Sequence, residues 1–111
     1  MAKYLILYRS PMSTSEQLAN ATPEQMKAGM DAWMAWAGKA GDKVADLGSP
    51  LAHSTHVGPG SAASGGADVC GYSILEADSA EEAAGALDGH PHLEMPGNSI
   101  EVLELMTMPG M

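Results

Sequence analysis

The chain has 111 residues, enough for one domain, which we place at residues 1–111, and fourteen acidic against five basic side chains give it a net charge of −9. This balance disfavours nucleic acid and anionic membranes as partners, because both are themselves negatively charged. The single cysteine, Cys70, excludes an internal disulfide. The sequence also has no apolar run long enough for a signal peptide or a membrane span. Together with the single cysteine, this predicts a cytoplasmic protein.

The first part of the chain predicts a strand, a loop and a capped helix. Residues 3–8 (KYLILY) form an apolar run that predicts a strand buried on both faces, and the polar segment 10–21 predicts a loop. Thr22, Pro23 and Gln25 make a capping box that starts a helix. Along this helix, apolar residues recur at helical spacing and predict one stripe: Met26, Met30, Trp33, Met34 and Ala37.

The remainder predicts three more strands, a long loop and a second helix. Residues 43–51 predict a strand in which Gly48 and Pro50 mark a bulge or an edge position. The Gly- and Ser-rich segment 53–68 predicts a flexible loop. Three elements are predicted after it: a strand at 69–77, a helix at 79–88 whose start is capped by Ser79, and a strand at 98–106.

The resulting order, β-α-β-β-α-β, is typical of the ferredoxin-like α+β sandwich, in which both helices lie on one face of the sheet. The other face is expected to be uncovered, yet the last strand is apolar on both sides. It has Ile100 and Val102 on one side and Leu103 and Leu105 on the other. Because an exposed apolar face marks an interaction surface, we predict a homodimer packed sheet against sheet about a two-fold axis.

Three segments of the chain resemble the YCII-related family: KYLILYR at the start, GSPL in the second predicted strand, and above all GYSILEADSAEEAAGALDGHPHLEMPGNSIEVLEL near the end. The resemblance implies a ferredoxin-like protomer and a dimeric α/β barrel with a cleft on each subunit. Some members act on small aromatic or lactone-like substrates through a proposed His/Asp pair, whereas many have no known activity. One branch carries a D-G-P-F loop signature. This chain has H-V-G-P-G at 56–60 instead, without the aspartate and the phenylalanine.

Two histidines, His90 and His92, flank Pro91 directly after the second predicted helix. Imidazole titrates near neutral pH, so His92 is a candidate general base and His90 a candidate ligand-binding residue. Alternatively, His90 caps the end of the helix and His92 packs in the turn. Asp46 and Asp68, at strand ends, are the carboxylates that would pair with a histidine, and Asp68 completes the predicted catalytic pair.

The other two histidines, His53 and His56, lie at the base of the predicted loop. Together the four histidines have H-x-x-H and H-x-H spacings, from which a metal site could be built. The chain has no HExxH motif and no cysteine pair. We therefore predict no metal and no cofactor, and keep His53 as a candidate ligand-binding residue.

Four further residues are candidates for ligand binding, each with a structural alternative. Arg9 is the only arginine and ends the first strand, where it would either hold a substrate carboxylate or form a surface ion pair. Tyr8 and Tyr72 would either donate hydrogen bonds in the cleft or pack in the core. Trp36 falls at the edge of the helical stripe and would line a pocket or the dimer rim, whereas Trp33 belongs to the core.

These observations leave two main hypotheses for function. In the first, a homodimer binds a small carboxylated organic molecule in a cleft and performs cofactor-free acid/base chemistry, such as isomerisation or elimination. His92 would be the base, Arg9 the anion anchor, and Tyr8 or Tyr72 a hydrogen-bond donor. In the second, the chain is a non-catalytic binding or accessory protein that acts through its dimer surface. A third hypothesis, a metal-dependent protein, requires at least three histidines to converge.

Overall fold

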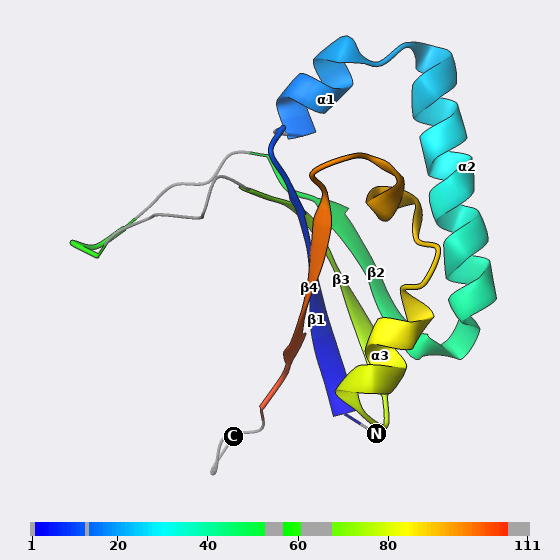
Figure 1. Cartoon of the computed structure of the whole chain (residues 1–111), viewed down its shortest axis with the longest axis vertical. Helices are drawn as coiled ribbons and strands as arrows, with labels where there is room; N and C mark the ends of the chain where they lie inside the picture. Colours follow the sequence, from blue (N-terminus) through cyan, green and yellow to red (C-terminus); the bar gives the residue numbers. More distant parts are fainter. Residues whose placement is uncertain (1, 13, 53–56, 61–67, 107–111) are drawn as a thin grey trace.

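The computed structural model describes residues 2–12, 14–52, 57–60 and 68–106. Within these residues the chain forms a small α+β unit with a four-stranded sheet, three helices and two short 3-10 helices (Figure 1). In chain order these elements are β1 (Ala2–Ser10), α1 (Thr14–Asn20), α2 (Pro23–Ala40), η1 (Gly41–Lys43), β2 (Val44–Pro50), β3 (Asp68–Ala77), α3 (Ala80–Ala86), η2 (Pro91–Glu94) and β4 (Ser99–Glu104).

The sheet has the strand order β2-β3-β1-β4, and every neighbouring pair is antiparallel. This order and the two crossovers through α2 and α3 are consistent with the predicted ferredoxin-like fold. Figure 1 shows α2 and α3 on the same side of the sheet, and no helix of the described residues on the other side. We call these sides the helix side and the open face.

Within one protomer, strand β1 is buried on one face only, so the prediction of a strand covered on both faces depends on a partner and stays a prediction. Tyr4, Ile6 and Tyr8 are buried on the helix side, whereas Leu5 and Leu7 between them remain partly exposed on the open face. The physical reason is the placement of the helices, since side chains alternate across a strand and only one side is covered.

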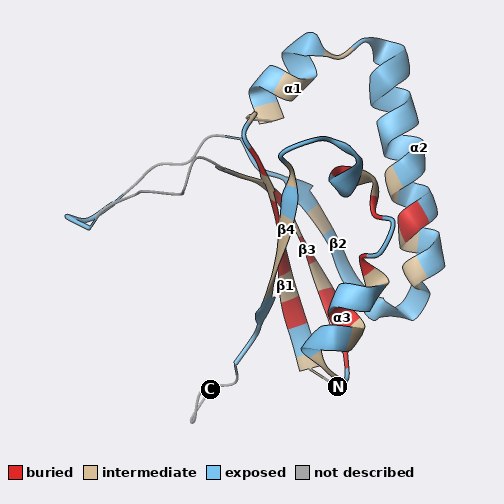
Figure 2. Cartoon of the chain, in the orientation of Figure 1, coloured by how far each residue is buried: buried red, intermediate tan, exposed pale blue. Residues whose placement is uncertain are grey.

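The core lies between the sheet and the helices, where Figure 2 shows the buried positions. Among the described residues it consists of eight apolar side chains: Tyr4, Ile6, Tyr8, Trp36, Leu75, Ala77, Ala83 and Leu87. Two of the eight are alanines, so much of its volume comes from the aromatic rings. A core this small leaves the stability of the protomer sensitive to any loss of packing.

Helix α2 begins as predicted, but only the C-terminal part of its predicted stripe, Trp33 and Ala37, packs on the core. The Thr22 side chain accepts a hydrogen bond from the Gln25 backbone N–H, and the Gln25 side chain accepts one from the Thr22 backbone N–H. Four residues of the C-terminal half pack on the core: Trp33, Trp36, Ala37 and Ala40. The methionines of the predicted stripe are exposed instead: Met26, Met30 and Met34. No helix within the described residues is long and apolar enough to cross a membrane.

Helix α1 lies where the sequence predicts a loop. None of its residues is buried, so it has no apolar stripe that would have revealed it. Its start is fixed by Thr14, whose hydroxyl lies within hydrogen-bonding distance of the backbone carbonyls of Leu51 (2.7 Å) and Cys70 (3.0 Å). Tertiary contacts with the sheet therefore place this helix.

Strand β2 is an edge strand with a bulge, as Gly48 and Pro50 predict. Its pairing with β3 shifts register between Asp46 and Ser49. Gly48 has φ = 83°, and a Cβ atom there would lie 1.7 Å from the carbonyl oxygen of Tyr72. Only glycine fits this position, because both the left-handed backbone and the close approach exclude a side chain.

Candidate functional site

Residues 90–94 bring two histidines into the interior of the protein. His90 precedes η2 as its N-cap, and Pro91 takes the first helical position, which its fixed φ favours. The His90 side chain accepts a hydrogen bond from the His92 backbone N–H (3.0 Å). This cap directs both rings under the helices, so that His90 is fully buried and His92 is 9 % exposed.

The His92 ring joins the ends of β1 and β4. Its Nε2 atom lies 2.9 Å from the carbonyl oxygen of Arg9 and 3.1 Å from that of Ser99. Because both partners only accept, Nε2 must carry the proton and donate to them. The other nitrogen, Nδ1, then carries the lone pair and lies 3.4 Å from the Asn98 amide nitrogen, which also donates to the His92 carbonyl. Through these contacts His92 links β1 to β4.

The His90 ring lies among aromatic rings. Its centroid is 4.3 Å from that of Trp36, 4.5 Å from that of Trp33 and 5.1 Å from that of Tyr8. Because Nδ1 accepts from His92, the proton lies on Nε2, which is buried and has no hydrogen-bond partner among the described residues. Burial first, and the neighbouring His92 second, lower the pKa of His90 to about 4. His90 is therefore neutral at pH 7.

Tyr8 lies against both histidines on the helix side. Its ring centroid is 5.3 Å from that of His92. Its hydroxyl lies 2.8 Å from the Ser73 hydroxyl, which in turn donates to the carbonyl of Leu47 (2.7 Å). Since Ser73 has one hydroxyl proton, Tyr8 is the donor to Ser73. Burial raises the pKa of the Tyr8 hydroxyl, and the contact with Ser73 partly opposes that rise.

Arg9 and Tyr72 are on the opposite side of the sheet from these rings. The Arg9 side chain donates from Nε to Glu101 on β4 (2.8 Å) and is partly exposed. Tyr72 pairs with Leu7 in the register between β1 and β3, which places it on the open face. Only the backbone carbonyl of Arg9 reaches His92. The sheet therefore separates the predicted anion anchor from the predicted base.

Trp36, which was expected to line a pocket or the dimer rim, is buried in the core. It is 5 % exposed and donates from Nε1 to the carbonyl oxygen of Ala86 (2.9 Å), so it ties α2 to α3. Trp33 is partly buried as a neighbour of the core and contacts the Tyr8 ring at 4.8 Å. Both tryptophans thus shape the surroundings of His90.

Several predicted site residues lie wholly or partly outside the described structure. His53 and His56 fall outside the described residues, as does the side chain of Asp68, whose backbone pairs with Ser10. Asp46 is exposed and accepts a hydrogen bond from the Gly48 backbone N–H (2.8 Å), which supports the β2 bulge. Within the described part of the chain, no three His, Cys, Asp or Glu side chains gather as metal ligands.

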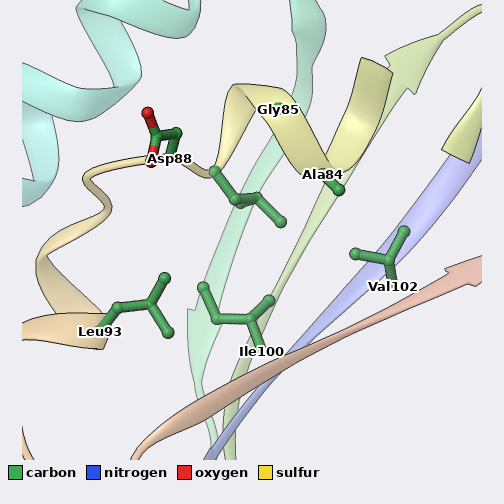
Figure 3. Close-up of a pocket in the computed structure, with 7 residues that line it drawn as sticks. Ala84, Gly85, Asp88, Leu93, Ile100 and Val102 are labelled. Atoms are coloured by element: carbon green, nitrogen blue, oxygen red, sulfur yellow. The ribbon is translucent and has the colours of Figure 1, made fainter. Parts of the chain in front are cut away.

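The structure also contains an open groove that sequence reasoning missed, between α3, η2 and β4 (Figure 3). It has a volume of about 590 Å³ and is lined by Ala84, Gly85, Leu87, Asp88, Leu93, Ile100 and Val102. The alternation of Ile100 and Val102 in the sequence places both on one face of a strand. The sequence could not show that this part of the face is left uncovered by the described helices, because this depends on the tertiary structure.

No protein-family model matches the chain, and no curated protein is significantly similar to it. Its function is therefore inferred from the placement of its own side chains. Three features enter that inference: the buried histidine cluster, the open sheet face and the groove.

Proposed function

We propose that the chain is a YCII-related protein that forms a homodimer through its open sheet face and works by binding, as an accessory protein, without catalysis. The observation that carries this proposal is the partly exposed apolar patch on that face: Leu5, Leu7, Tyr72, Ile74 and Leu103. An apolar patch across neighbouring strands is typical of a surface that a partner covers. A second copy offers the same patch in return.

The charges around this patch favour self-association. Lys3 and Arg9 lie on the same face of β1, and their neighbours on β3 and β4 include Glu76 and Glu101. The four charges balance, although the whole chain carries −9. Two copies can therefore meet here without the repulsion that most other surfaces would impose.

The engagement of the acid/base groups favours binding over catalysis. His92 uses its Nε2 proton on two backbone carbonyls, and Tyr8 uses its hydroxyl on Ser73. His90 is enclosed by rings. A general base must reach a substrate proton directly or through one water. A location in the cytoplasm belongs to the same proposal and is supported by Cys70, a free thiol within the described residues.

Sedimentation equilibrium of wild type and Leu7→Glu tests the dimer. Wild type should sediment as a dimer, and Leu7→Glu as a folded monomer, because a carboxylate would be buried unpaired in the interface. Met30→Glu is the matched control, since it makes the same kind of change on the exposed face of α2. A monomeric wild type, or a Leu7→Glu variant that stays dimeric, contradicts the proposal.

The convergence of Tyr8, His90 and His92 favours a second candidate, cofactor-free acid/base catalysis on a small carboxylated molecule. His92 would be the base, with Asp68 as its partner, and η2 would have to move to admit a substrate. Turnover of small aromatic acids or lactones by wild type, lost in His92→Asn while the variant stays folded, would establish this candidate. The binding proposal predicts no turnover by either protein.

A further inference from the structure

The groove between α3, η2 and β4 is apolar and open to solvent. Ile100 and Val102 form one side, from the helix side of the edge strand β4. Leu87, at the end of α3, lies between the core and the groove, and Leu93 of η2 is 47 % exposed. Figure 3 shows Leu93 and Ile100 side by side, with Ala84 and Val102 further along. Aliphatic side chains from three elements thus offer a surface for a small apolar group.

The elements that line this groove carry acidic side chains but no lysine or arginine of their own. No lysine or arginine follows Lys43 in the sequence, so none of the three elements that line the groove carries a cation. Asp88 lines the groove and is exposed. In Figure 3 its carboxylate lies at the opposite end of the view from Val102.

Further carboxylates gather beyond Val102. Glu104, two residues along β4, accepts a hydrogen bond from the Tyr4 hydroxyl (3.3 Å). Burial, then Glu104, and then Glu81 and Asp78 raise the pKa of that hydroxyl, in keeping with acidic residues on β4 and around the start of α3. An apolar surface therefore lies between Asp88 at one end and a group of acids at the other.

We propose that this groove binds a small apolar molecule that carries a positive charge, such as an aryl- or alkylammonium ion. The aliphatic lining takes the apolar part, and Asp88 with the surrounding acidic field attracts the ammonium group. The same field disfavours a carboxylated ligand at this place. Since Arg9 lies on the open face, it does not offset this field from within the groove.

The groove lies on the helix side, so its occupancy does not depend on the dimer. Sedimentation reports on the open face and ligand titration reports on the groove, so failure of one proposal is distinguishable from failure of the other.

The test is a titration followed by amide NMR with three probes of similar size: 2-phenylethylammonium, 2-phenylethanol and 3-phenylpropionate. Three variants accompany wild type. Ala84→Leu fills the groove from an exposed helical position, and Asp88→Asn removes its charge while keeping its shape. Asp31→Asn is the matched control, because Asp31 is an exposed carboxylate on α2 that pairs with Lys27.

The ammonium probe should bind wild type more tightly than the alcohol, and the carboxylate probe should bind most weakly. Asp88→Asn should weaken ammonium binding by about threefold to fivefold, the range expected for one exposed ion pair, and Asp31→Asn should leave it unchanged. Ala84→Leu should abolish binding of the ammonium probe. Absence of ammonium binding, equal or tighter binding of the carboxylate, or binding that survives Ala84→Leu overturns the proposal.

Discussion

The two faces of the sheet are both apolar, yet they differ in what covers them. On β3, Leu75 is fully buried under the helices, whereas its neighbour Ile74 faces the open side and stays partly exposed. On the helix side, histidine and tyrosine join the apolar core through hydrogen bonds. On the open face, apolar residues meet a rim of balanced charges. The comparison teaches that one face stabilises the protomer, while the other is free to associate.

The largest expected effect is a difference in stability between variants of Leu75 and Ile74. Leu75→Ala should lower the free energy of unfolding by about 3 kcal/mol, because it leaves a cavity in a small core. Ile74→Ala should cost about 1 kcal/mol in dilute protein, since less of its surface is buried. Urea unfolding measures both. If the proposed dimer forms, the loss in free energy of unfolding caused by Ile74→Ala should grow with protein concentration. A loss that is the same at all concentrations would contradict the proposal that the open face associates.

The second prediction concerns pH and the helix side. The folded state holds the pKa of His90 at about 4, below the value of 6.5 for a free histidine. Between pH 4 and pH 6.5, His90 is therefore protonated in the unfolded chain but not in the folded chain. This contribution is complete above pH 6.5 and is lost as the pH falls towards 4, at a cost of about 2–3 kcal/mol.

Urea unfolding between pH 4 and 7 measures this effect as a slope. The His90→Asn variant is the matched control, because its side-chain oxygen can still accept from the His92 N–H but does not titrate. Tyr8 and His92, the titratable groups that face His90, are present in both proteins. His90→Asn should lose less stability than wild type as the pH falls. Identical pH dependence in the two proteins would show that His90 does not cause the loss.

The smallest effect compares the two tyrosines. Tyr8→Phe removes a buried hydrogen bond to Ser73 and should cost about 1 kcal/mol. Tyr72→Phe on the open face should change the stability by less than about 0.5 kcal/mol, because the Tyr72 hydroxyl has no hydrogen bond among the described residues. Thermal unfolding at one fixed protein concentration compares them, and a larger loss for Tyr72→Phe would reverse the assignment of the faces.

Much of the fold could be predicted because local signals agreed with the tertiary structure. Thr22 and Ser79 start helices through capping patterns, and Gly48 marks the bulge in β2. Helix α1, and how much of the α2 stripe is buried, could not be predicted in this way. Thr14 holds α1 through contacts distant in sequence. Of the predicted α2 stripe, Trp33 and Ala37 pack on the core while the methionines stay exposed.

The candidate site was less predictable, although one signal was available. Tyr8 and Arg9 are neighbours in a strand, so the period of two already places their side chains on opposite faces. The hypothesis that Tyr8 and Arg9 bind the same ligand did not take this alternation into account. The enclosure of His90 by Trp33 and Trp36 depends on how α2 crosses the sheet, which no local pattern specifies.

The most direct test of the account is the dependence of wild-type unfolding on protein concentration, measured over about a hundredfold range. If the open face pairs two copies, the free energy of unfolding should rise by about 1.4 kcal/mol of dimer for each tenfold increase in concentration. Leu7→Glu should lose this dependence. A wild-type unfolding midpoint that does not move with concentration would contradict the central claim that a second copy covers the open face.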